Sequence, residues 1–307
     1  MVQRNRVLFS VLLLTGVVTD YANQSLEYSS VLDRKIYEKV GKHHSYAALF
    51  TTNTKNHILY LAVDHTIDED SETFLLIKTA YQYFKPTVVI LEGLQKSCGY
   101  SPLFFKRFRE EKRAHNLNRL EIEYTADLAD SNNVQFIGAE PDDQLIFNDL
   151  TINDNYTEQD VAFFYFTRQI PQIVCEKNIE VFQDLLWEHK FTQYMAKELP
   201  QEYYFRYDDY KAWLIKHCGV IHYHDLIKRS FCNPDKNGNF IQRISHKVCA
   251  IRDKYIVEVI TGLACKSSRV LVVYGSSHLA IQYDFLTEAF NTPLFFKDEK
   301  ALATIFK

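Results

Sequence analysis

The stretch at residues 270–279 constrains the fold of this chain more than any other part of the sequence. Residues 270–274 form a short, β-branched apolar run, which is typical of an interior strand in a parallel sheet. Gly275 opens a tight Gly-Ser-Ser turn, because glycine adopts backbone angles that other residues resist. The turn places His278 at the carboxyl end of a strand, where open α/β sheets bind their ligands.

Three other apolar segments end in the same way, each with an imidazole or a carboxylate just after a predicted strand. They are residues 58–63 before His65, residues 87–91 before Glu92, and residues 134–139 before Glu140. Because the carboxyl ends of neighbouring parallel strands lie along one edge of a sheet, these side chains are expected to share one site with His278.

Two imidazoles and two carboxylates at His65, Glu92, Glu140 and His278 predict a site for a divalent metal ion, with Zn, Mn, Fe and Co all admissible. Such a metal lowers the pKa of a bound water and produces hydroxide near neutral pH. The same residues also suit catalysis without metal, with a histidine as general base and a carboxylate that orients it. A single histidine or glutamate after a strand is usually an ordinary loop residue, so the hypothesis depends on the fourfold recurrence.

The alternation of strands with helical segments predicts an α/β fold with a central, mainly parallel sheet flanked by helices. Residues 46–51 and 58–63, separated by a polar turn, predict a hairpin. A long, aromatic, helical insertion is expected at about residues 142–248, covering the site, within a single domain at residues 23–307. The basic cluster between residues 106 and 113 is interpreted as a solvated helix face.

Composition excludes nucleic acid as a partner, because the net charge is −4 and no dense Lys/Arg stripe is present. The expected partners are a peptide or small-molecule substrate, or a host or other partner protein. Gly-x-Ser-x-Gly, P-loop and Gly-x-Gly-x-x-Gly motifs are absent from the sequence, which argues against serine hydrolases of the α/β type and against common nucleotide-binding folds.

The first 22 residues predict a signal peptide, because a basic hexapeptide precedes the apolar run at residues 7–18. That run is too short to span a bilayer, so no transmembrane span is expected in the mature chain and the protein is expected to be secreted or periplasmic. The alternative interpretation is a first buried strand or helix. Six cysteines permit disulfides in an exported chain, or several are small buried apolar residues.

The order of these motifs, with Arg252-Asp253 in the helix before the Gly275-Ser-Ser-His278 turn, resembles the superfamily of TIKI and TraB proteases, haem-associated ChaN lipoproteins and erythromycin esterases. The resemblance covers about residues 45–296. The chain departs from the family pattern at Ala62-Val63, where Gly-Glu or Gly-Thr is usual, and at Ile251, where glutamate is common.

The resemblance implies a site between two Gly-x-x-His-like turns and marks as catalytic His65, Glu92, Glu140, Arg252 and His278. Arg252 would stabilise an anion. The alternative without a function is that Arg252 and Asp253 form a charge pair at the surface. The leading functional hypothesis is a metal-dependent hydrolase of the TIKI/TraB type, in particular a peptidase. A second is a ChaN-like protein that binds haem, iron or another ligand without turnover. A third is a catalytically degenerate secreted protein that acts by binding a partner.

Overall fold

The computed structural model describes residues 45–306, apart from residues 54, 116 and 118 and the segments 178–183, 199–204, 220–225 and 227–228. The predicted signal peptide lies outside the described residues. The chain divides into two compact units, of which the first comprises Met1–Asp142 with Asp253–Lys307 and the second comprises Asp143–Arg252. Each unit has its own hydrophobic core.

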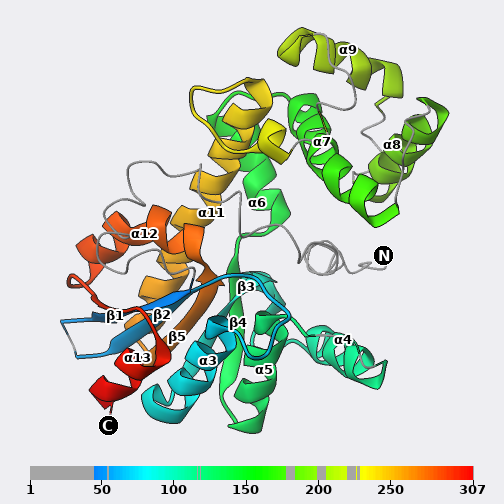
Figure 1. Ribbon diagram of the computed structural model, residues 1–307. Coiled ribbons are helices and arrows are strands. Elements are labelled where there is room, and N and C mark those ends of the chain that lie inside the picture. The colour runs from blue at the N-terminus through cyan, green and yellow to red at the C-terminus, as the bar shows by residue number, and fades with distance from the viewer. Residues whose placement is uncertain are drawn as a thin grey trace, which may run out of the picture. The chain divides into compact units, whose positions relative to one another are not determined.

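A six-stranded, mostly parallel sheet forms the centre of the first unit (Figure 1). The strands are β1 (Tyr46–Thr51), β2 (His57–Val63), β3 (Val88–Gln95), β4 (Gln135–Glu140), β5 (Arg269–Gly275) and β6 (Leu294–Phe296). Their spatial order is β4-β3-β5-β2-β1-β6. The neighbouring pairs β4–β3, β3–β5 and β5–β2 are parallel. β1 pairs antiparallel with both β2 and β6, which confirms the predicted hairpin.

Helices cover both faces of this sheet, which confirms the predicted α/β class (Figure 1). The carboxyl-terminal part of α11 (Phe240–Ala264) and α12 (Ser276–Ala289) pack on one face. On the other face lie α3 (Glu72–Thr79), α4 (Leu103–Ala114), α5 (Glu121–Ser131) and α13 (Glu299–Phe306). Side chains of a strand alternate between these two layers, so a central strand must be apolar at almost every position. This is why β2 and β5 read as continuous apolar runs.

Arg109 of α4 is buried, so the interpretation of its cluster as a solvated helix face is wrong at this residue. Its guanidinium lies 5.3 Å from the ring centroid of Phe105 and 5.4 Å from that of Phe136. It also forms ion pairs with Asp127 at 2.6 Å and Asp130 at 2.7 Å. A planar guanidinium can stack on rings while it binds carboxylates, which makes arginine suitable for a buried position that the local sequence does not reveal.

The second unit is helical in its described residues. Its helices are α6 (Asp143–Asn148), α7 (Glu158–Lys177), α8 (Asp184–Glu198), α9 (Tyr207–Cys218) and the first half of α11. Single helical turns occur here at Asp149–Asn153 and Arg229–Cys232, and in the first unit at Ala80–Phe84 and Lys96–Cys98. The core is aromatic: Phe163, Phe166, Phe191 and Tyr210 are fully buried and pack with ring centroids 5.0–5.7 Å apart.

Two further findings concern the described part of the chain. None of its helices is both long and apolar enough to cross a membrane. The cysteines whose side chains are described are free thiols, namely Cys98, Cys218, Cys232, Cys249 and Cys265.

Substitution of Gly138 is expected to destabilise the sheet, because a Cβ atom there would overlap the backbone carbonyl of Leu94. The register between β3 and β4 shifts between Leu91 and Gln95, and Leu94 lies within this irregular stretch. Gly138→Ala is expected to lower the free energy of unfolding by about 2 kcal/mol or more, measured by urea denaturation.

Gly262→Ala provides the matched control, because a Cβ atom at this position of α11 would meet open space. Alanine is the better helix former, so this variant is expected to be as stable as the original chain or more stable by up to about 1 kcal/mol. Equal unfolding midpoints for the two variants would contradict the close approach of β3 and β4.

Candidate functional site

Four adjacent parallel strands bring the residues predicted from sequence to one edge of the sheet. In spatial order, β4 ends in Glu140, β3 contains Glu92, β5 leads to His278 at the start of α12, and β2 leads to His65. The register pairs Val63 of β2 with Gly275 of β5, so the two histidines follow directly from neighbouring strand ends.

The Glu92 carboxylate lies between the two histidines. Its Oε1 is 3.7 Å from Nε2 of His65 and 3.5 Å from Nε2 of His278. Its Oε2 accepts a hydrogen bond of 2.6 Å from the backbone N–H of Gly275. A Cβ atom on residue 275 would lie only 3.3 Å from His65 Nε2 and 3.4 Å from Glu92 Oε2. A side chain at residue 275 would therefore crowd the cluster, and the imidazole or the carboxylate would have to move by a few tenths of an ångström.

His65 is held from its other ring nitrogen by Glu121, the first residue of α5. The distance from His65 Nδ1 to Glu121 Oε1 is 2.5 Å, and the Glu121 side chain is fully buried. The second carboxylate oxygen of Glu121 accepts the backbone N–H of Thr66 at 3.2 Å. Sequence reasoning missed Glu121, because an acidic residue in the first turn of a helix is ordinarily explained by the helix dipole.

His278 is held in the same way by Asp253 of α11. Its Nδ1 lies 2.7 Å from Asp253 Oδ1, which also accepts a 2.7 Å hydrogen bond from Nε2 of Gln282. The hydroxyl of Tyr60 donates to Gln282 Oε1 at 3.1 Å, which fixes the amide orientation. Asp253 is buried, so its interpretation as half of a surface charge pair with Arg252 is wrong.

Glu140 ends β4, and Arg252 lies in α11. Glu140 is buried at the end of β4, and its charge adds to those of Asp253 and Glu92 in raising the pKa of Tyr60, for which burial is the largest cause. Arg252 belongs to the second unit, where its charge acts on Tyr165. Among the described residues, no three His, Cys, Asp or Glu side chains form a group arranged to hold a metal ion.

Neighbouring opposite charges dominate the pKa values of the cluster formed by His65, Glu92 and His278. Burial alone would lower the pKa of His65, but the carboxylates of Glu92 and Glu121 outweigh it and raise this pKa to about 9. Burial also opposes a charge on His278, yet Asp253 and Glu92 hold its pKa well above the usual range. Burial tends to raise the pKa of Glu92, but both histidines and the Gly275 N–H bring it well below normal. At neutral pH, the cluster therefore consists of two imidazolium groups and one carboxylate.

No protein-family model, curated protein or solved structure matches this chain. The resemblance to the TIKI, TraB, ChaN and erythromycin esterase superfamily therefore stays a prediction from motif order. The chemistry of the site follows from its geometry: two imidazoles present Nε2 to one carboxylate, and each is held at Nδ1 by a second, buried carboxylate.

The raised pKa of His65 predicts a pH-dependent contribution to stability in protein freed of metal by a chelator. This contribution is fully present below the unfolded-state pKa of about 6.5 and is lost as pH rises through about 9. The difference in Tm between the original chain and His65→Gln is therefore expected to be largest near pH 6 and to shrink toward pH 9.

His57→Gln is the control, because it removes a histidine of β2 that contacts Thr51 and lies outside the cluster. The comparison needs only thermal unfolding followed by circular dichroism at several pH values. A Tm difference for His65→Gln that stays constant across this range would contradict the assignment of a charged imidazole to the site.

Proposed function

We propose that the protein is a hydrolase whose active site is the cluster of His65, Glu92 and His278. The observation that carries the proposal is the pair of carboxylate–imidazole contacts, Glu121 to His65 and Asp253 to His278, with both Nε2 atoms directed at Glu92. A carboxylate on Nδ1 fixes the ring orientation and stabilises the imidazolium form, which is what proton transfer from Nε2 requires.

Within this proposal, His65 is the proton donor that meets the substrate. Its side chain is 32% exposed, whereas that of His278 is 12% exposed, so His65 is the more accessible of the two. An imidazolium in this position stabilises a developing oxyanion or protonates a leaving group. His278, held by Asp253 and close to Glu92, keeps that carboxylate in place.

Glu92 is the proton acceptor for the attacking water. Hydrolysis removes one proton from water and gives one to the leaving group, and Glu92 and His65 lie within 3.7 Å of each other to do both. The charge on His65 lowers the pKa of Glu92. Transfer of the His65 proton to the leaving group therefore makes Glu92 a stronger base as the reaction proceeds.

A metal-dependent form of the hydrolase places Zn, Mn, Fe or Co at His65, Glu92 and His278, with Glu140 as a further ligand. The separations of 3.5 and 3.7 Å between Nε2 atoms and Glu92 Oε1 are close to the distance of about 3.4 Å between ligands of a tetrahedral ion with bonds near 2.1 Å. The described residues nevertheless contain no complete metal-holding group, so no catalytic step is assigned to a metal.

Glu92→Gln tests the hydrolase directly, because it keeps the shape of the side chain and removes its charge. With chromogenic esters and fluorogenic peptides as substrates, kcat/KM is expected to fall by about 100-fold or more, the usual contribution of a positioned acid or base. Glu258→Gln, an exposed position of α11, is the matched control and is expected to keep full activity.

Undiminished turnover in Glu92→Gln, with the fold intact by circular dichroism, would contradict the proposed active site. If neither the original chain nor Glu92→Gln hydrolyses any of these substrates, the result would favour the two non-catalytic hypotheses, a ligand-binding protein or a partner-binding protein. A haem titration followed by absorbance then separates these two.

Metal content tests the metal-dependent form independently of activity. If the metal-dependent form holds, the purified original chain carries about one equivalent of a divalent transition metal, and a His65→Ala/His278→Ala double variant has lost it. Equal and negligible metal in both proteins, measured by mass spectrometry, would reject the metal-dependent form while leaving the metal-free hydrolase standing.

A further inference from the structure

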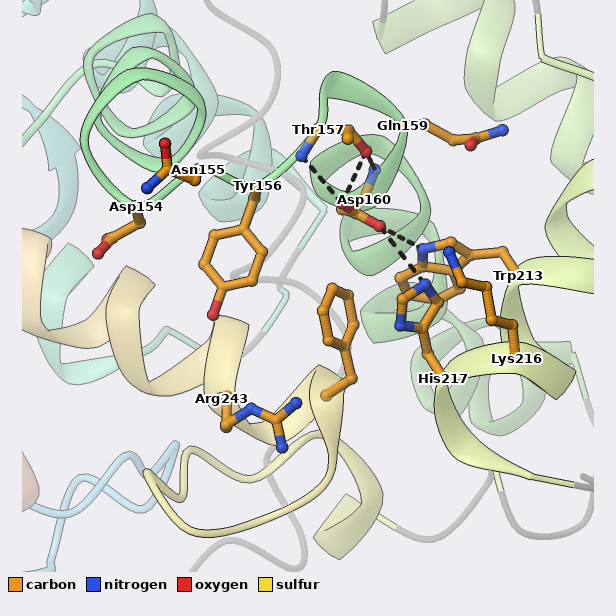
Figure 2. Close-up of a pocket in the computed structure, with 11 residues that line it drawn as sticks. Asp154, Asn155, Tyr156, Thr157, Gln159, Asp160, Trp213, Lys216, His217 and Arg243 are labelled. Atoms are coloured by element: carbon orange, nitrogen blue, oxygen red, sulfur yellow. Dashed lines mark hydrogen bonds and ion pairs between the residues drawn. The ribbon is translucent and has the colours of Figure 1, made fainter.

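The second unit contains a cavity of about 330 Å³ that is separate from the histidine cluster and belongs entirely to that unit (Figure 2). It is lined by the segment that leads into α7, by α9 and by the first turns of α11. Its volume is at the lower end of the range for small-molecule sites, so it suits a compact ligand.

One wall of the cavity is aromatic and centred on Phe240. The ring centroid of Phe240 lies 4.0 Å from that of His217, 5.6 Å from that of Tyr156 and 5.9 Å from that of Trp213. The Tyr156 and Trp213 rings meet it edge to face, at interplanar angles of 78° and 77°. The lining is therefore partly aromatic, which suits a ring-bearing ligand.

Asp160 holds this wall together, and its hydrogen-bonding capacity is already used. Its Oδ1 accepts the indole N–H of Trp213 at 2.6 Å and lies 3.9 Å from Nε2 of His217 (Figure 2). Its Oδ2 accepts the backbone N–H of Thr157 at 2.9 Å and the Thr157 hydroxyl at 2.6 Å. The one buried carboxylate of the cavity therefore orients the wall and is not available to a cationic ligand.

Two cationic side chains line the same cavity without a carboxylate partner among the described residues. The Lys216 ammonium has no ion pair there, and Arg243 donates only to the Gly238 carbonyl, at 2.8 Å, while its guanidinium lies 5.7 Å from the Phe240 ring centroid. The other acidic residue of the lining, Asp154, is paired with Lys247 at 2.7 Å. Lys216 and Arg243 are therefore the two cations of the lining that are open to an anionic ligand.

The geometry points to a binding site for a small organic anion, a phosphate or carboxylate group carried on a flat ring. The ring would lie against Tyr156, and the anionic group would face Arg243 or Lys216, which line the same cavity. An aromatic cage for a cationic ligand is the competing interpretation, but Arg243 already covers Phe240 and two unpaired cations would repel such a ligand.

Isothermal titration calorimetry with phenyl phosphate and benzoate tests the site, and benzyl alcohol serves as a neutral ligand of similar shape. At least one anion is expected to bind the intact protein, with the stronger of the two identifying the preferred group. Benzyl alcohol is expected to bind more weakly than that anion. Failure of both anions to bind, or equal binding of benzyl alcohol, would overturn the proposal.

Substitutions place the binding in this cavity. Lys216→Gln and Arg243→Gln are each expected to weaken binding of the preferred anion about tenfold, as loss of one charged hydrogen bond does. Lys236→Gln, an exposed lysine in a turn of the same unit that does not line the cavity, is expected to bind as the original chain does. Unchanged affinity in the Lys216→Gln/Arg243→Gln double variant would overturn the proposal, whatever the hydrolase assay shows.

Discussion

The contact of the Glu92 carboxylate with Gly275 and the two histidines is the interaction on which the edge of the sheet depends. The Glu92 side chain is only 14% exposed, and a buried charge without partners costs several kcal/mol. Its partners come from two neighbouring strands: Gly275 ends β5, His278 follows it, and His65 follows β2. Glycine at residue 275 favours this arrangement, since a Cβ atom there would lie within 3.4 Å of both the imidazole of His65 and the carboxylate of Glu92.

The same requirement connects the sheet to both of its helical layers. Glu121, which holds His65, is on α5, and Asp253, which holds His278, is on α11. These two helices pack on opposite faces of the sheet. Each imidazole is therefore fixed between a strand-end carboxylate and a helix carboxylate, so the orientation of the cluster follows from packing of the whole first unit and not from one loop.

A site residue could be predicted from the sequence only where the residues next to it in the chain indicate its position. The strand ends at His65, Glu92 and His278 can be recognised in the sequence. Each follows a short apolar run whose length is typical of a buried strand, and each is a polar residue at the end of that run. The helix carboxylates have no such signal. Glu121 looks like an ordinary acid in a first helical turn, and Asp253 looks like the partner of its neighbour Arg252. Their roles are decided by which side of a helix faces the sheet edge, and that is a property of tertiary packing.

The metal-free and metal-dependent forms of the proposed hydrolase differ in what lies between the Nε2 atoms and Glu92. In the first, each imidazole carries a proton there, and two positive charges face one carboxylate. In the second, one divalent ion takes the place of both protons, because a histidine binds metal only when its ligating nitrogen is deprotonated. The net charge of the cluster is the same in both, so the helix carboxylates Glu121 and Asp253 suit either. The fold thus supplies a place for two positive charges beside Glu92, and ligand chemistry decides what carries them.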